Sequence, residues 1–312
     1  MEQSTVIWRL TDGKRGHERQ TEGLAKALAS RVKVEVDTIA VPPSRARGFM
    51  EFCSGTFHRG DRLPTPVLII GAGGACQWPL LTARRARGGR AVYLMHPALP
   101  PAWFDLCIVP RHDRPKESTK LIVSDGPLNP MERTSNRRRD RGLILLGGPS
   151  SHHAWDTPAV VRDVLAIVDR RLEITWQISD SRRSPQDLGA AMSALSRTNA
   201  RFVPNAKTTS AWLPEALGRS RYVWVSGDSV AMIYEALTAG AKVGIIDVPA
   251  KRRDRITGVA EELKAAGRVA TLAEWARHGD MELDETPFSE AGRCADIILK
   301  LWPEIGGGKR SA

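Results

Sequence analysis

Short runs of apolar, β-branched residues alternate with segments of helical periodicity along this 312-residue chain. Residues 5–10 and 32–39 have the composition of strands, and residues 17–30 between them have that of a helix. This order is typical of βαβ units, which assemble into a parallel sheet covered by helices. The alternation therefore predicts an α/β protein.

The alternation occurs twice, on either side of residues 127–141, which are proline-interrupted, polar and heavily charged. A composition of this kind is typical of an interdomain linker. Before it, further elements are expected as strands at 66–70, 91–95 and 104–110 and a helix at 76–86. After it, they are expected as strands at 142–146, 173–178, 201–203, 222–225 and 242–246 and helices at 157–171, at 186–197 and from Asp228 onward.

We therefore expect two doubly wound, Rossmann-like domains that face a cleft. The N-terminal domain is expected at 1–135 and the C-terminal domain at 141–303, with a last helix that could pack back on the N-terminal domain. Residues 304–312 are expected to form a frayed tail. Because ligands of doubly wound sheets bind beyond the carboxyl ends of the strands, the loops after the strands are where functional residues are expected.

The formal net charge of +11, largely from arginine, favours a polyanionic partner: nucleic acid, anionic lipid or a phosphorylated small molecule. Nucleic acid is not expected, because the chain has no RNP-like interleaving of aromatic and basic residues and no helix-turn-helix or finger signature. The four cysteines form no C-x-x-C pair, which argues against a zinc site and a disulfide framework.

Two further features bear on location. No apolar run approaches the ~20 residues that span a bilayer. The N-terminal residues lack the basic region, apolar stretch and cleavage site of a signal peptide. A cytoplasmic location is therefore expected.

The stretch S-G-D-S-V-A-M-I-Y-E-A follows a strand and places an acid inside an apolar helix. If Asp228 or Ser226 caps this helix, its first amide groups, near Ser229, would stabilise a diphosphate. Glu235 lies seven residues beyond Asp228, about 10 Å along a helix, which suits a carboxylate that binds the ribose of the same nucleotide. The alternative is a salt-bridged acid at the border of the buried stripe.

The stretch T-D-G-K-R-G-H-E-R-Q, residues 11–20, is a turn from a strand into a helix, and its two glycines allow a tight bend. It does not match G-x-G-x-x-G, so it gives little support to dinucleotide binding. His17 falls in the first helical turn, where the positive helix end favours the neutral imidazole that can accept a proton. A capping histidine is the alternative interpretation.

Two more strand ends carry groups suited to phosphate. In L-L-G-G-P-S-S-H-H, Gly147 and Gly148 expose backbone amides and Ser150 offers a hydroxyl, although a simple tight turn would have the same sequence. In S-D-S-R-R-S-P, Arg182 and Arg183 could hold a departing diphosphate, or form a solvated charge pair. The adjacent histidines at 152 and 153 have no carboxylate spaced to complete a metal site, so no metal is expected.

The segment between the second and third expected strands mixes Phe49, Met50 and Phe52 with arginines. Apolar side chains among cations suit peripheral contact with an anionic membrane surface. A buried helix with flanking arginines would have the same composition.

Taken in order, D-G-x-x-G-H-E-x-Q, L-L-G-G-P, S-R-R-S-P and D-S-V-A-M-I-Y-E-A resemble the motifs of bacterial members of the mitochondrial-fission "elongated mitochondria" family. The resemblance spans about residues 6–302 and includes F-D-L-C-I-V-P-R-H-D. It implies the two-Rossmann GT-B glycosyltransferase fold and a more distant similarity to the enzyme that adds N-acetylglucosamine to lipid I. It also implies that Glu235 holds the donor ribose and that the acceptor side is lined by Gly13, Gly16, His17, Glu18 and Gln20.

The leading functional expectation is transfer of a sugar from a nucleoside diphosphate to a hydroxyl of a cell-envelope lipid or polysaccharide precursor. His17 is the first candidate for the catalytic base, followed by Asp12 and Asp113. No D-x-D motif lies at a strand end, so neither a metal nor a cofactor is expected beside the nucleotide-sugar substrate. The location is then the cytoplasm, including peripheral contact with the cytoplasmic face of the inner membrane. The alternatives are a nucleotide-sugar 2-epimerase and a non-catalytic membrane-associated scaffold.

Overall fold

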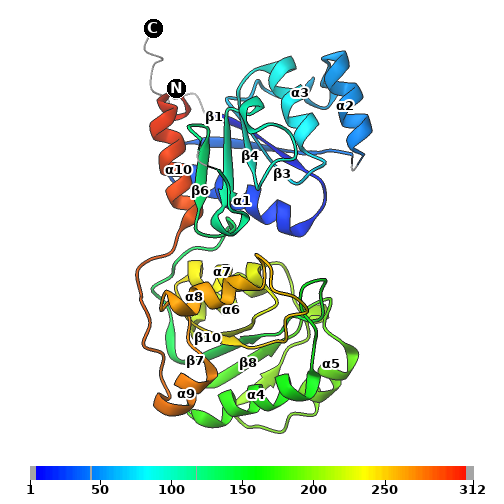
Figure 1. Cartoon of the computed structure of the whole chain (residues 1–312). Coiled ribbons are helices and arrows are strands. Elements are labelled where there is room, and N and C mark those ends of the chain that lie inside the picture. Colours follow the sequence, from blue (N-terminus) through cyan, green and yellow to red (C-terminus); the bar gives the residue numbers. More distant parts are fainter. Residues whose placement is uncertain (1–4, 43, 117, 307–312) are drawn as a thin grey trace. The chain divides into compact units, whose positions relative to one another are not determined.

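The computed structural model of the chain describes residues 5–42, 44–116 and 118–306 (Figure 1). It divides into two compact units: unit 1 comprises Met1–Pro130 and Ser289–Ala312, and unit 2 comprises Met131–Phe288. Each unit is built around one parallel sheet with helices on both faces. The predicted fold class, an α/β protein with two doubly wound, Rossmann-like domains, is confirmed.

The sheet of unit 1 has six parallel strands in the order β2-β1-β3-β4-β5-β6. Its strands are β1 (Thr5–Thr11), β2 (Val34–Ala40), β3 (Leu68–Ala72), β4 (Arg90–Leu94), β5 (Leu106–Pro110) and β6 (Leu121–Ser124). Its helices are α1 (Arg15–Ala29), α2 (Arg45–Ser54), α3 (Gln77–Arg87) and α10 (Glu290–Leu301). Leu28 of α1 and Ile298 of α10 pack on one face of the sheet, and Leu80 of α3 packs on the other. Because both faces are covered, β3 and β5 are apolar and buried along their whole length.

The sheet of unit 2 has five parallel strands in the order β11-β10-β7-β8-β9. Its strands are β7 (Arg138–Leu145), β8 (Thr175–Ser179), β9 (Ala200–Phe202), β10 (Ser220–Ser226) and β11 (Lys242–Ile246). Its helices are α4 (Thr157–Arg170), α5 (Gln186–Ser193), α6 (Trp212–Arg219), α7 (Val230–Ala239), α8 (Gly258–Ala265) and α9 (Leu272–His278). Helices α6, α7 and α8 cover one face, and α4, α5 and α9 cover the other.

Large aromatic rings fill the second of these faces. Trp275 of α9 lies edge-on to Trp176 and Trp224, with ring centroids 6.1 and 5.9 Å apart. The neighbouring strands have glycine at the positions over which these rings lie. A Cβ on Gly142 would lie 2.7 Å from Trp176 Cδ2, and a Cβ on Gly244 would lie 2.6 Å from Trp224 Cε3. The strand glycines of unit 2 are therefore packing residues.

The unit boundaries differ from the expected domain limits. β7 begins at Arg138, inside the expected linker, and the division falls between Pro130 and Met131. Helix α10 packs against α1 in unit 1. Residues 303–306 form a 3-10 turn rather than a frayed tail, because Ile305 is fully buried and its carbonyl accepts a 2.6 Å hydrogen bond from Thr5. Residues 307–312 of that expected tail lie outside the described residues.

Candidate functional site

At the carboxyl end of β1, a histidine in the first turn of α1 lies against a buried carboxylate of the preceding loop. Nδ1 of His17 lies 2.9 Å from Oδ2 and 3.1 Å from Oδ1 of Asp12. The Asp12 side chain is 2% exposed and the His17 side chain is 20% exposed. A carboxylate in this position keeps the proton on Nδ1 and leaves the Nε2 lone pair to accept a proton from a substrate.

Glycines on two loops make this pair sterically feasible. Gly13 adopts φ +76° directly after Asp12, and Gly73, just past the end of β3, adopts φ +85°. A Cβ on Gly73 would lie 2.5 Å from His17 Cε1 and 2.8 Å from Asp12 Oδ2, so only glycine leaves space for the pair. Sequence reasoning missed Gly73 as a site residue; the G-A-G-G run at the strand end was the available signal.

The other residues predicted for the acceptor side are involved in local contacts. Glu18 Oε1 accepts a 2.6 Å hydrogen bond from the Thr11 hydroxyl, which ties α1 to the end of β1. The Gln20 amide donates to the Gly16 carbonyl at 3.4 Å, within α1. A Cβ on Gly16 would meet nothing within 4 Å, so Gly16 is not required by packing.

Asp113 follows β5, three strand positions from β1 in the sheet. At about 4.8 Å per strand this is roughly 14 Å from the end of β1. Its carboxylate instead lies 3.8 Å from Nε2 of its neighbour His112. Asp12 and His17 are thus brought together, and Asp113 is not with them.

In unit 2 the glycine loop after β7 is held by side chains from the loop after β10. The Gly147 amide donates to the Ser226 hydroxyl at 2.7 Å, and the Gly148 amide donates to Asp228 Oδ2 at 3.1 Å. A Cβ on Gly147 would lie 2.6 Å from Asp228 Cγ. These amides therefore have protein partners, and the glycines allow the Asp228 carboxylate to approach.

Arg183 and Asp228 form an ion pair beside this loop. Arg183 Nη1 also donates to the Gly148 carbonyl at 2.6 Å. The Asp228 side chain is fully buried, and its Oδ1 has no hydrogen-bond partner among the described residues. Arg182 is exposed. Of the two predicted arginines, one is therefore fixed in the loop cluster and the other faces solvent.

Helix α7 begins beside the same loop, and its predicted capping differs from the structure. The N-cap residue is Ser229, whose side chain makes no capping hydrogen bond. Asp228 and Ser226 do not cap the helix, because their side chain oxygens accept from Gly148 and Gly147. Ser150 does not cap the helix either, because its hydroxyl oxygen accepts from the amides of His152 and His153, at 3.1 and 3.0 Å. The first turn of α7 therefore keeps amide groups that no side chain of the described residues is seen to cap.

Glu235 lies on α7 and is 4% exposed. It is five residues past the first helical residue, about 7.5 Å along the axis. Ile233 and Ala236, on the same buried stretch, are fully buried in the core of unit 2. Glu235 is thus part of the packed helix. Its distance from the amino end of α7 is within the length of one nucleotide.

Comparison with known proteins places the chain in a family. The sequence model described as Mitochondrial fission ELM1 matches residues 15–302. The chain belongs to this family. No curated protein matches the sequence.

Solved structures similar to this ELM1-family chain share its fold at low sequence identity. MurG of Acinetobacter baumannii has a TM-score of 0.53 and 15% identity, over 95% of this chain and 99% of that one. A UDP-N-acetylglucosamine 2-epimerase of Neisseria meningitidis, bound to UDP-N-acetylglucosamine, has a TM-score of 0.54 and 10% identity, over 97% and 100%. A Listeria monocytogenes protein designated a UDP-N-acetylglucosamine 2-epimerase has a TM-score of 0.62 and 10% identity, over 99% and 98%. These likenesses show the fold, with two Rossmann-like domains, and extend over nearly the whole of each chain.

In unit 2 the ELM1-family chain has a further histidine–carboxylate pair, which sequence reasoning did not find. His152 Nδ1 lies 2.7 Å from Asp254 Oδ2, and the hydrogen bond from His152 holds the pKa of Asp254 well below its usual range. Next to it, His153 is buried, and this burial lowers its pKa. The partners are 102 residues apart in sequence, so no local spacing could reveal them.

The described residues contain no group of three histidine, cysteine or acidic side chains that could hold a metal ion. The four cysteines are free thiols. Burial raises the pKa of the Cys76 thiol, near Asp12, to about 12, so this thiol stays protonated and is not a nucleophile at neutral pH.

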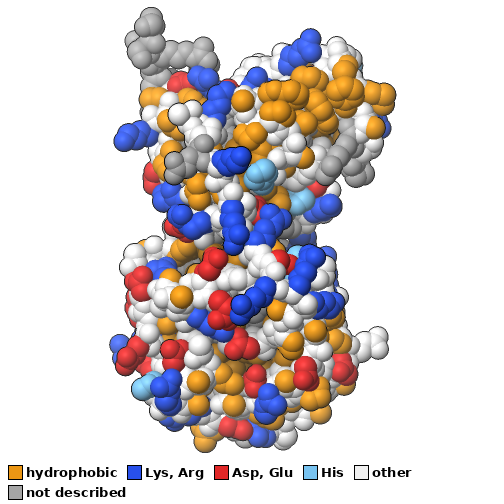
Figure 2. Space-filling model, in the orientation of Figure 1, with side chains coloured by type: hydrophobic (Ala, Val, Ile, Leu, Met, Phe, Trp, Pro, Cys, Tyr) orange, Lys and Arg blue, Asp and Glu red, His pale blue; other side chains and the backbone are white. Residues whose placement is uncertain are grey.

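An apolar surface of unit 1 lies over α2 and α3 (Figure 2). Phe49 is 47% exposed and Met50 is 63% exposed, and Trp103 adds to the apolar surface. Phe52 is only half-buried and packs on Trp78, with ring centroids 5.0 Å apart. Within the described part of the chain, every helix is too short or too polar to span a bilayer.

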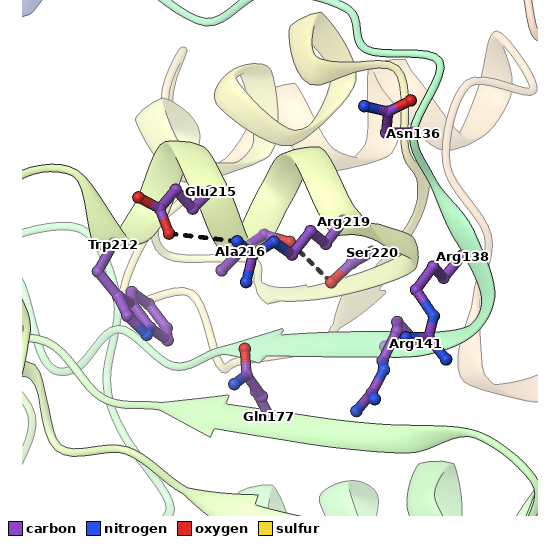
Figure 3. A pocket seen from close by; sticks show the side chains of 10 residues that line it. Asn136, Arg138, Arg141, Gln177, Trp212, Glu215, Ala216, Arg219 and Ser220 are labelled. Atoms are coloured by element: carbon purple, nitrogen blue, oxygen red, sulfur yellow. Dashed lines mark hydrogen bonds and ion pairs between the residues drawn. The ribbon is translucent and has the colours of Figure 1, made fainter.

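Unit 2 also has a pocket of about 480 Å³ away from the predicted site (Figure 3). Arg138 and Arg141 of β7 and Ser220 of β10 line it near the amino ends of their strands, with Gln177 and Trp212. None of the predicted site residues lines this pocket. Parallel strands bind their ligands at the carboxyl ends, so it is not the expected donor site.

Proposed function

We propose that the chain is a GT-B glycosyltransferase that moves a sugar from a nucleoside diphosphate to a hydroxyl of a cell-envelope lipid or polysaccharide precursor. The observation that carries the proposal is the Asp12–His17 pair at the carboxyl end of β1. Family membership and the fold support it, and one structure of the same fold holds UDP-N-acetylglucosamine.

In this proposal unit 1 binds the acceptor. Nε2 of His17 takes the proton of the acceptor hydroxyl as that oxygen forms a bond to the anomeric carbon of the donor sugar. The bond from this carbon to the diphosphate oxygen breaks, and its electron pair leaves with the diphosphate. The imidazolium that forms is stabilised by the buried Asp12 carboxylate, 2.9 Å from Nδ1.

Unit 2 binds the donor. The uncapped amide groups at the start of α7, together with Arg182, stabilise the leaving diphosphate. Arg183 stabilises it from its position against Asp228 and the Gly148 carbonyl. Glu235 accepts hydrogen bonds from the ribose hydroxyls. Gly147 and Gly148 shape the loop in this scheme, since their amides already donate to Ser226 and Asp228.

The first test is thermal unfolding with UDP-, GDP-, CDP- and dTDP-sugars. A donor at about 100 times its Kd adds roughly 2.7 kcal/mol to the free energy of unfolding and raises the melting temperature. The increase is expected for one nucleotide class in the wild type and to be lost in Glu235→Gln. If no nucleotide sugar raises the melting temperature, the donor assignment is wrong.

The second test is release of nucleoside diphosphate with an envelope lipid extract as acceptor. His17→Gln is expected to lower the rate by about 10²–10⁴ while leaving stabilisation by the donor unchanged. A donor sugar that changes configuration with no acceptor present would instead indicate an epimerase. Full complementation of a deletion phenotype by both Glu235→Gln and His17→Gln would indicate a scaffold.

A further inference from the structure

A second pocket of unit 2, of about 390 Å³, lies at the edge of the sheet opposite the candidate donor site. It is bounded by the amino ends of β10 and β11 and by the carboxyl end of α7. Five cationic side chains line it: Arg133, Arg137, Arg221, Lys242 and Arg268. None of them belongs to the proposed donor or acceptor machinery.

Only two of the five cations form ion pairs with acids in or beside this pocket. Lys242 lies 3.3 Å from Asp280 and 3.6 Å from Glu285. Arg268 lies 3.0 Å from Asp284. The remaining three arginines form no ion pair with any described residue. The pocket therefore carries an excess of positive charge.

Arg137 is the most constrained of these three arginines. Its Nε and Nη2 atoms are buried and have no hydrogen-bond partner among the described residues. Its Nη1 donates a long hydrogen bond, 3.4 Å, to the Thr134 carbonyl. Burial, together with the neighbouring Arg133, lowers the pKa of Arg137 to about 10, so the guanidinium is still charged at neutral pH. Buried donors of a charged group are costly unless a partner satisfies them.

The end of helix α7 does not supply that partner. Cations are favoured near the carboxyl end of a helix, where the carbonyl groups lack intrahelical partners. Here the Gly240 amide donates to the Leu237 carbonyl and the Ala241 amide donates to the Ala236 carbonyl, at 2.9 and 3.2 Å. Two carbonyls of the last helical turn thus accept from backbone amides, and the Arg137 Nε and Nη2 atoms have no partner among the described residues.

The remaining lining limits the kind of ligand. Leu237, Leu283 and Phe288 add apolar side chains to the lining. The planar donors of guanidinium groups match phosphate oxygens, which accept two hydrogen bonds from one arginine. We propose that this pocket binds the phosphate group of a small phosphorylated molecule or of a lipid headgroup, through Arg137, Arg133 and Arg221.

The test measures the affinity of inorganic pyrophosphate by calorimetry at fixed ionic strength. Arg137→Met and Arg221→Met are each expected to weaken the affinity about tenfold or more. Arg201→Met is the matched control, because Arg201 is an exposed arginine of the same unit outside the pocket. The affinity of Arg201→Met for pyrophosphate should equal that of the wild type.

The melting temperature separates ligand binding from a structural role. Arg137→Met removes a buried charge without an acidic partner, so the ligand-free variant should be at least as stable as the wild type. Lower stability of that variant with unchanged pyrophosphate affinity would overturn the proposal. The proposal would also be overturned if Arg183→Met weakened pyrophosphate binding while Arg137→Met and Arg221→Met did not. The anion would then bind at the start of α7.

Vesicles distinguish the two sources of phosphate. Binding to phosphatidylcholine vesicles that contain phosphatidic acid, lost in Arg137→Met and kept in Arg201→Met, would identify a lipid headgroup. Binding of pyrophosphate alone, with no difference between these variants on vesicles, would identify a free phosphorylated molecule. Failure to bind either probe would overturn the proposal, and the result is independent of whether a nucleotide sugar binds at the other edge of the sheet.

Discussion

A Cβ atom on Gly73 would lie 2.5 Å from Cε1 of His17, so this loop glycine is required for the position of the imidazole on α1. Gly73 follows β3, and His17 lies in the first turn of α1, which follows β1; these two strands are neighbours in the sheet. Gly73 also adopts φ +85°, a conformation that disfavours any side chain. This contact makes the Asp12–His17 pair testable without replacing either member.

Gly73→Ala is expected to displace His17 and to lower transferase activity by about 10²-fold, the lower range for loss of a general base. Gly88→Ala is the matched control, because Gly88 has φ +78° and open space around its Cβ position. Both variants incur a backbone cost of roughly 1–3 kcal/mol, which thermal unfolding measures. Equal activity in the two variants would show that the position of His17 does not matter for the reaction.

The Arg183–Asp228 ion pair predicts that a substitution of Asp228 restores part of the stability lost when Arg183 is replaced. Arg183→Met leaves the fully buried Asp228 carboxylate without its ion-pair partner and should lower the free energy of unfolding by roughly 1–3 kcal/mol, discounted because Arg183 is 38% exposed. Adding Asp228→Asn to the same chain should recover part of that loss. Urea unfolding measures both variants, and a double variant no more stable than Arg183→Met would contradict the pairing.

His153 predicts a pH dependence of stability. Burial lowers its pKa in the folded state, so between that pKa and the unfolded value of about 6.5 the unfolded chain binds more protons. The free energy of unfolding should therefore fall as the pH drops below about 6.5. In His153→Phe this part of the pH dependence should disappear, whatever the stability at pH 7. Urea unfolding at several pH values from 7.5 to 5 measures it, and an unchanged pH profile would argue against burial of the ring.

The apolar surface over α2 predicts binding to anionic membranes. Phe49→Ser with Met50→Ser should reduce flotation with vesicles that contain acidic lipid. Leu172→Ser is the control, because Leu172 is 68% exposed and belongs to unit 2, whereas Phe49 and Met50 belong to unit 1. Equal flotation of the two variants would indicate that Phe49 and Met50 are ordinary surface residues. Weaker flotation in high salt is expected as well, since each cation near such a surface contributes only about 1 kcal/mol.

The sequence alone determined most of the strands and helices, because apolar periodicity and glycine at strand ends are local properties. Residues 242–246 were expected as a strand and form one, and the helix expected at 157–171 forms at Thr157–Arg170. Elements with weak local signals were not expected: β6 has four residues, and α6 contains Pro214 in its first turn.

The tertiary structure decided which of these strand ends meet. Gly73 reaches His17 because β3 lies beside β1. Asp113 follows β5 and is separated from these two residues because β4 lies between β3 and β5. Asp228 takes the place beside Gly147 that the sequence suggested for a phosphate, and Asp254 pairs with His152 from 102 residues away. Strand order is set by packing and long-range pairing rather than by local periodicity, so a sequence pattern identifies the loops that carry polar groups but not the partners that each group finds.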